Sequence, residues 1–366
     1  MTVIHRIKNF FLFSFLFFSG FFVTGCSSLS YTLQIVNGHF EVLSKSEPVD
    51  EVIEKPETSA LLRQKLLLAK SARAFASENL NLPKNSSYSR YTNLGRDAVV
   101  WNVVVAKEFS LDLENWCFPL AGCVSYKGFY SLKDAEKFAE KKRSVPGTEV
   151  AILDVPAYST LGWSNWLGGD PLLNTFIYGA DIYVVGLIFH ELAHQKIYVN
   201  DDSSFNEAFA TAVERGGVNA WLKINGPESN LDVYKIELER RKNFNDLLAN
   251  TSADLRALFK SGKNSSEMKK KKKKIFIALR KKLLSSAYLD NFQKNQKTKY
   301  VNWVKSINNA YLGMVGLYED LTPGFTVLIE KSNFSWSDFY QKVEKISKLP
   351  KLKRREVLLK YASEIQ

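Results

Sequence analysis

The sequence predicts an α+β fold, in which a small mixed sheet with an edge strand packs on two central helices and a mainly helical C-terminal region follows. Two short β-branched runs, Val99–Val105 and Glu149–Val155, have the composition and length of strands. Ile182–Val199 and Phe205–Ile224 are predicted as two helices with nearly continuous apolar surfaces, and the aliphatic neighbours in the first indicate that it is buried. Beyond Pro227 the segments become long, charged and amphipathic.

The composition is that of a folded globular protein. Hydrophobic residues make up 45% and charged residues 24% of the 366 residues, which excludes a wholly disordered, collagen-like or disulfide-dense chain. The 50 basic residues outnumber 38 acidic ones, giving a net charge of +12 and a pI near 9.3. Such a surplus suits an anionic neighbour, either a nucleic acid or a phospholipid surface.

The N-terminus has the pattern of an export signal. Met1–Asn9 carries basic residues and no acid, and Phe10–Val23 is apolar but shorter than the roughly 20 residues of a membrane-spanning helix. Val23–Cys26 resembles the lipobox of bacterial lipoproteins, which implies removal of residues 1–25 and acylation of Cys26. Ser27, in place of an aspartate, favours the outer membrane, facing the periplasm. The alternatives are a plain membrane anchor and an ordinary signal with a chance cysteine.

An exported chain has consequences for its partners and its cysteines. Nucleic acid is not expected as a partner, because the sequence shows no aromatic-basic RNA-binding motif. An oxidising periplasm permits Cys117 and Cys123 to form a disulfide, and two buried reduced thiols are the alternative.

Local patterns predict the elements that precede the central helices. Thr58–Leu80 places apolar side chains on one side at helical spacing. Val124–Tyr130 is predicted as a further strand and Leu132–Lys142 as a helix. Ala157–Trp163 is expected to be an edge strand or a loop around Gly162.

Six consecutive lysines, Lys269–Lys274, lie between two long predicted helices, Leu231–Phe259 and Ile275–Leu289. One interpretation is a solvated loop or helix end. The other is contact with anionic phospholipid, where each lysine near the surface contributes about 1 kcal/mol.

A metal-binding pattern stands in the first central helix. His190, Glu191 and His194 form an H-E-x-x-H sequence, and residues four apart on a helix share a face, so both rings can reach one ion. Glu191 is then close enough to activate a water. The alternative is a pair of core histidines. The other two histidines, His5 and His39, lie far upstream.

An acid must therefore supply the third ligand that a catalytic zinc requires. Glu207 at the start of the next helix is the candidate, although Ser204 and Glu207 also fit a capping box. Asp201, Asp202 and Glu214 are the other acids in reach. Glu214 lies two turns after Glu207 on the same face, which suits a partner that holds a ligand histidine.

The segments His190–Gln195 and Asn206–Glu214 resemble a bacterial family of putative aminopeptidases related to the gluzincins. Further matches, which extend the resemblance over most of the mature chain, are Cys117–Tyr130, Pro156–Trp163, Asp170–Leu173, and Asn308–Ala310 with Tyr318 and Pro323.

The resemblance implies a zinc peptidase with gluzincin-like packing. His190, His194 and Glu207 would be the zinc ligands and Glu191 the general base for peptide hydrolysis. Residues 156–163 would form an edge strand that binds an extended peptide substrate. Tyr158 and Tyr318 are open candidates for stabilising the oxyanion, and exopeptidase or endopeptidase action is also open.

The predicted organisation has four parts. Residues 1–25 are a lipoprotein signal peptide, 26–57 a lipid-anchored tether with a loop-like Ser44–Glu57, 58–226 a zinc metallopeptidase core, and 227–366 a basic, mainly helical region. The alternative function is a lipid-anchored periplasmic binding or scaffold lipoprotein with a non-catalytic metal site. Glu191 favours the enzyme, because a scaffold needs no general base.

Overall fold

A computed structural model describes residues 26–118, 122–157, 169–200, 202–226, 228–289, 294–315 and 321–365. Contacts divide the chain into two units, Met1–Lys45 and Ser46–Gln366. The described part of the first unit is one helix, α2 (Cys26–Ser44), within the segment predicted as a tether. None of the described helices combines the length and apolar character needed to cross a membrane.

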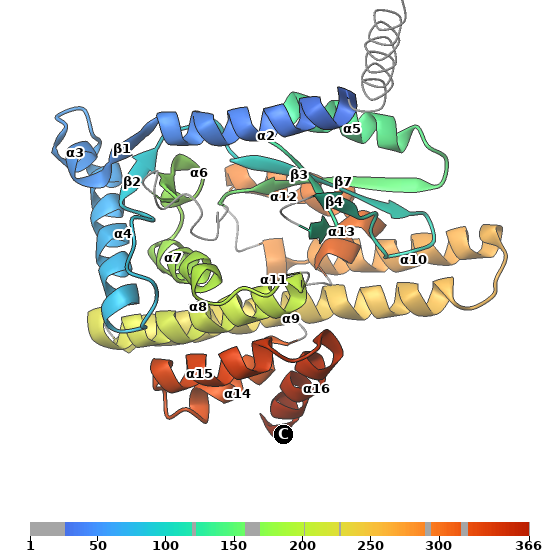
Figure 1. Ribbon diagram of the computed structural model, residues 1–366. Coiled ribbons are helices and arrows are strands. Elements are labelled where there is room, and N and C mark those ends of the chain that lie inside the picture. The colour runs from blue at the N-terminus through green and yellow to red at the C-terminus, as the bar shows by residue number, and fades with distance from the viewer. Residues whose placement is uncertain are drawn as a thin grey trace, which may run out of the picture. The chain divides into compact units, whose positions relative to one another are not determined.

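The second unit is mixed α+β, mostly helical with small sheets (Figure 1). Its strands are β1 (Ser46–Pro48), β2 (Arg90–Thr92), β3 (Val100–Lys107), β4 (Trp116–Phe118), β5 (Gly122–Val124), β6 (Lys127–Phe129), β7 (Thr148–Val155) and β8 (Leu172–Leu173). Its helices up to the centre of the chain are α3 (Val49–Glu54), α4 (Ala60–Glu78), α5 (Leu132–Arg143), α6 (Asn174–Ile177), α7 (Asp181–Lys196) and α8 (Ser203–Asn225).

The described secondary structure of the C-terminal part of this unit consists of helices. It comprises α9 (Glu228–Phe259), α10 (Ser265–Leu283), α11 (Ser286–Leu289), α12 (Lys294–Ser306), α13 (Asn309–Val315), α14 (Thr322–Glu330), α15 (Trp336–Ser347), α16 (Lys351–Ala362) and the short 3₁₀ turn η2 (Ser363–Ile365).

The strands form three small sheets instead of the single sheet predicted. In one, β3 lies between β6 and β7 and is antiparallel to both. In another, β2 pairs antiparallel with β1 and parallel with β8. The third is the β4–β5 ribbon, in which a disulfide joins Cys117 to Cys123. The strand predicted over Val124–Tyr130 is interrupted, because β5 ends at Val124 and β6 begins at Lys127.

Strand β3 is buried on both faces, which explains its β-branched run. Val104 and Ala106 pack against Ala310 and Met314 of α13. Val103 and its neighbours on the opposite face are also buried, and α5 packs on β3 and β7.

Aromatic side chains join the central helices. Phe75 of α4 stacks on Phe189 of α7 at 6.0 Å and meets Trp221 of α8 edge-on at 5.1 Å. Phe209 of α8 contacts Phe325 of α14 at 5.8 Å. Helices α7 and α8 are therefore held from several sides.

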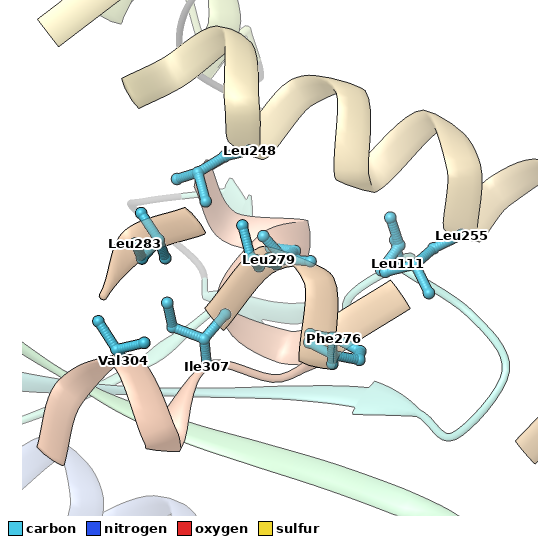
Figure 2. Close-up of a cluster of buried hydrophobic side chains, with 9 residues drawn as sticks. Leu111, Leu248, Leu255, Phe276, Leu279, Leu283, Val304 and Ile307 are labelled. Carbon is cyan, nitrogen blue, oxygen red and sulfur yellow. The ribbon is translucent and has the colours of Figure 1, made fainter. Parts of the chain in front are cut away.

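A separate apolar cluster joins α9, α10 and α12. Figure 2 shows Leu248 and Leu255 of α9 above Phe276 and Leu279 of α10. The remaining members are Leu111, Leu283, Val304, Ile307 and Leu312.

Two local expectations were wrong. Ser44–Glu57 is not a loop: it contains β1 and α3, because Val49 and Val52 are buried. The lysine run Lys269–Lys274 is neither a loop nor a helix end, since it lies inside α10, four residues after the helix starts. Residues 158–163 of the expected edge strand lie outside the described residues, and the domain boundaries predicted at residues 57 and 226 stay predictions.

Candidate metal centre

A short connection brings α8 back along α7. The Asn206 side chain fixes this connection, because it donates to the carbonyl of Val199 and accepts from its amide, both at 2.8 Å. Asp202 is the N-cap of α8 and accepts from the Phe205 amide at 3.4 Å. The same carboxylate forms a buried pair with Arg354 of α16, at 2.8 and 2.9 Å. The start of α8 is therefore fixed in place.

Three side chains that could hold a metal ion converge between these helices. His190 Nε2 lies 3.3 Å from Oε2 of Glu207, and His194 Nε2 lies 3.7 Å from Oε1 of the same residue. One candidate donor atom from each residue lies within 4.8 Å of the others. The two rings belong to successive turns of α7, with centroids 4.9 Å apart. Two imidazoles and one carboxylate form a donor set that suits zinc.

The second nitrogen of His190 is held by Glu214. Nδ1 lies 3.2 Å from Oε2 of Glu214, whose other oxygen accepts from Nη1 of Arg241 at 3.3 Å. Gly186 leaves room for this carboxylate, because a Cβ there would lie 3.2 Å from Cγ of Glu214. A carboxylate on the outer nitrogen is the usual support of a metal-binding histidine.

Glu191 is buried beside this group. Burial is the main cause that raises its pKa to about 7, and the charges of Glu207 and Asp170 act in the same direction. It lines a cavity of about 230 Å³ together with His190, Tyr183 and Arg241. A buried carboxyl group with a pKa near 7 is suited to accept and return a proton.

The two histidines differ in charge in the metal-free protein. Burial disfavours the charged ring of His190, but its bonds to Glu207 and Glu214 outweigh this and raise its pKa to about 10. Burial and the charge of His190 lower the pKa of His194 to about 4. Burial opposes ionisation of Glu207, but the two rings lower its pKa.

His194 carries an unsatisfied ring nitrogen. Its Nδ1 is buried and has no hydrogen-bond partner among the described residues. Its Nε2 is too far from Glu207 for a hydrogen bond. The lone pair of Nε2 is therefore available to a cation, whereas Nδ1 stays without a partner among the described residues.

The structure brings together all five residues expected in the centre, which are His190, Glu191, His194, Glu207 and Glu214. The capping-box interpretation of Ser204 and Glu207 is wrong, because Asp202 is the N-cap and Glu207 faces the rings.

Three other expected site residues lie outside what the structure describes. Tyr158 and Tyr318 lie outside the described residues. Cys26 begins α2, and its side chain is not among those described.

Sequence reasoning missed Gly186, Tyr183 and Arg241. Gly186 gave a weak signal, since it stands one turn before His190 on the same face. Tyr183 was overlooked in the apolar helix. Arg241 gave no signal in the sequence, because it stands in a charged helix 27 residues after its partner Glu214.

Comparison with protein families supports the resemblance. The family model described as "Putative aminopeptidase" matches residues 30–358. Searches of curated proteins and of solved structures found no match. Because the matched segment spans most of the sequence and includes the whole candidate centre, the chain belongs to the putative aminopeptidase family.

Proposed function

We propose that the protein is a zinc-dependent peptide hydrolase of the gluzincin type, anchored to a bacterial membrane by a lipid on Cys26. The observation that carries the proposal is the convergence of His190, His194 and Glu207 within 4.8 Å. Family membership supports peptide substrates and an aminopeptidase activity, with attack within longer peptides as the alternative.

The donor set fits zinc. His190, His194 and Glu207 would hold the ion, and three protein ligands are the usual number in a catalytic site. The available Nε2 of His194 and the carboxylate behind His190 support this assignment. A zinc ion bound there would supply Lewis-acid polarisation of the scissile carbonyl and of the attacking water.

Glu191 is the proposed general base. It follows His190 on α7 and lines the same cavity, so its carboxylate can take a proton from the attacking water. The same group then donates that proton to the leaving amine. Its burial excludes bulk water from the proton transfer.

The adjoining cavity is the proposed site for part of the peptide. Leu187 and Tyr183 give it an apolar side, and Pro156 and Ala157 follow β7 at its margin. The segment predicted to pair with an extended peptide, residues 156–163, begins at this margin, and its edge-strand conformation stays a prediction.

Location is proposed from the sequence. Lipid on Cys26 would hold the protein on the outer membrane, facing the periplasm, and the basic α10 adds electrostatic attraction to anionic lipid. Lys272 is buried, so the other five lysines of the run provide that attraction.

The test is the zinc content of the purified protein. One zinc ion per chain is expected in the parent, and much less in Glu207→Ala and His194→Ala. Glu191→Gln should keep its zinc and lose peptide hydrolysis. Glu237→Ala is the matched control, because Glu237 is exposed on α9 and pairs only at 4.0 Å with Arg240.

Two results would contradict the proposal. A well-folded parent that takes up no zinc would exclude the metal centre and favour a binding or scaffold lipoprotein. Full zinc content in Glu207→Ala would remove Glu207 from the ligand set.

A further inference from the structure

Helix α10 buries part of its lysine run against the ends of two strands. Glu108 directly follows β3, and Glu149 lies opposite Ala106 on β7, so both acids stand at the same end of this strand pair. Lys272 is buried and forms an ion pair with Glu149. It also donates to the carbonyl of Glu108 at 2.7 Å. These contacts fix α10 on the sheet.

A cavity of about 300 Å³ opens beside these contacts. Side chains at Lys269, Lys272, Lys273, Phe276 and Arg280 line it, and their spacing places them on one face of α10. Ile307 and Asn308, between α12 and α13, form the opposite wall. Figure 2 shows Phe276 and Ile307 on neighbouring segments.

The charges of this cavity do not balance. Glu149 pairs with Lys272, and Glu108 pairs with Lys269 at 3.2 Å. Lys273 has no hydrogen bond or ion pair within the described residues and is exposed. Lys273 and Arg280 therefore carry two positive charges that neither acid of the cavity neutralises.

Arg280 is held in position but keeps free hydrogen-bonding capacity. Its Nη2 donates to the Ile307 carbonyl at 2.9 Å, and its guanidinium lies over the Phe276 ring at 5.5 Å. Its Nε is buried and has no partner among the described residues, so Nη1 is the nitrogen through which this half-buried guanidinium can donate to a ligand. A fixed, planar guanidinium is well suited to bind a phosphate group.

We propose that this cavity, formed by Lys269, Lys273, Arg280 and Asn308, binds a phosphate monoester. A phosphate monoester carries close to two negative charges at neutral pH, which matches the surplus of two positive charges. Arg280 and Lys273 donate to the phosphate oxygens, and the cavity is large enough for the phosphate and its ester oxygen. The source of the group is either a soluble phosphomonoester or the headgroup of a lipid.

The test is calorimetric titration of the full chain in detergent micelles. Inorganic phosphate and glycerol 3-phosphate represent the soluble sources, and micelles containing phosphatidic acid represent the lipid source. Micelles with phosphatidylcholine instead are the control. Binding of either source at submillimolar concentration supports the proposal, and the arm that binds more tightly identifies the source.

The variants separate a cavity from general surface charge. Lys273→Gln with Arg280→Gln should weaken binding at least tenfold. Lys270→Gln with Lys274→Gln removes the same charge from lysines outside the cavity and should change it less than threefold. Lys273→Gln alone should weaken binding several-fold with an unchanged unfolding temperature, because that side chain makes no described polar contact.

Two results would overturn the proposal. One is the absence of binding to every phosphate source by the folded parent. The other is an equal loss of binding in the two double variants, which would assign the effect to surface charge alone.

Discussion

The metal centre and the α10 cavity both gather charged side chains where elements distant in sequence meet, with opposite charge balances. With His190 in the neutral form that binds a metal, the three carboxyl groups of the candidate centre, Glu191, Glu207 and Glu214, outnumber its one cation, Arg241, which pairs with Glu214. The α10 cavity has four cationic side chains against two acids. At both sites, some charged side chains form ion pairs within the protein and stabilise the fold. The remaining charged side chains are available to a ligand.

The largest expected effect tests whether the negative surplus binds zinc. Zinc at a thousand times its dissociation constant should raise the free energy of unfolding of the parent by about 4 kcal/mol. Glu207→Ala should lose most of this gain, because a ligand is missing. Thermal unfolding with and without zinc measures it, with Glu237→Ala as control. Equal stabilisation of Glu207→Ala and the parent by zinc would show that the acidic surplus between α7 and α8 does not bind the ion through Glu207.

The next effect separates a lysine that stabilises the fold from a lysine that is available to a ligand, both within the run Lys269–Lys274. Lys272→Met should lower the free energy of unfolding by about 3 kcal/mol, because Glu149 would be left unpaired. The loss is at the lower end for a buried pair, since Glu149 also accepts from the Asn309 amide at 2.8 Å. Lys273→Met should change stability by less than about 0.5 kcal/mol. Denaturant unfolding measures both variants. Similar losses of stability would show that Lys272 and Lys273 contribute equally to the fold.

A smaller effect concerns the side chains that position Glu214. Gly186→Ala and Arg241→Met should each weaken zinc binding about tenfold, because Glu214 would no longer be held against His190. Chelator competition measures the affinity. Arg240→Met is the matched control, since Arg240 points to Glu237 at the surface. Unchanged zinc affinity in Arg241→Met would show that Arg241 only stabilises the fold.

The smallest effect is a proton release. Because the pKa of His190 is about 10 in the metal-free protein, zinc must displace its proton at pH 8, whereas His194, with a pKa of about 4, has none to lose. About one proton should therefore leave per zinc bound, and zinc affinity should rise with pH up to about 10. Calorimetry in two buffers of different ionisation enthalpy measures this number. A value of zero would mean that His190 is neutral before zinc binds.

The sequence predicted well which side chains would come together between α7 and α8, because helical periodicity governs most of their positions. The spacing of His190 and His194 places both rings on one face. Glu207 and Glu214 are two turns apart on the next helix, and a short connection leaves that helix little freedom to lie elsewhere. Local sequence is sufficient when ligands belong to adjacent helices.

Other features depend on distant partners and could not be predicted. Lys272 is buried because Glu149 lies opposite it, 123 residues earlier, and a run of lysines contains no sign of such a partner. The helix α3 forms because Val49 and Val52 find an apolar environment in a segment whose prolines and acids suggest a loop. In the same way Arg241 reaches Glu214 only through the path of α9.

The buried pair between Asp202 and Arg354 has a consequence for the order in which the protein matures. Residues 190–207, which carry the candidate metal ligands, emerge during synthesis well before Arg354. Until Arg354 arrives, the carboxylate that caps α8 has no counter-charge and stays in water rather than in the core. The N-cap of α8 therefore reaches its described, buried pairing only when almost the whole chain is present. Under the proposed export, this order would place assembly of the candidate metal centre after the chain has crossed the membrane.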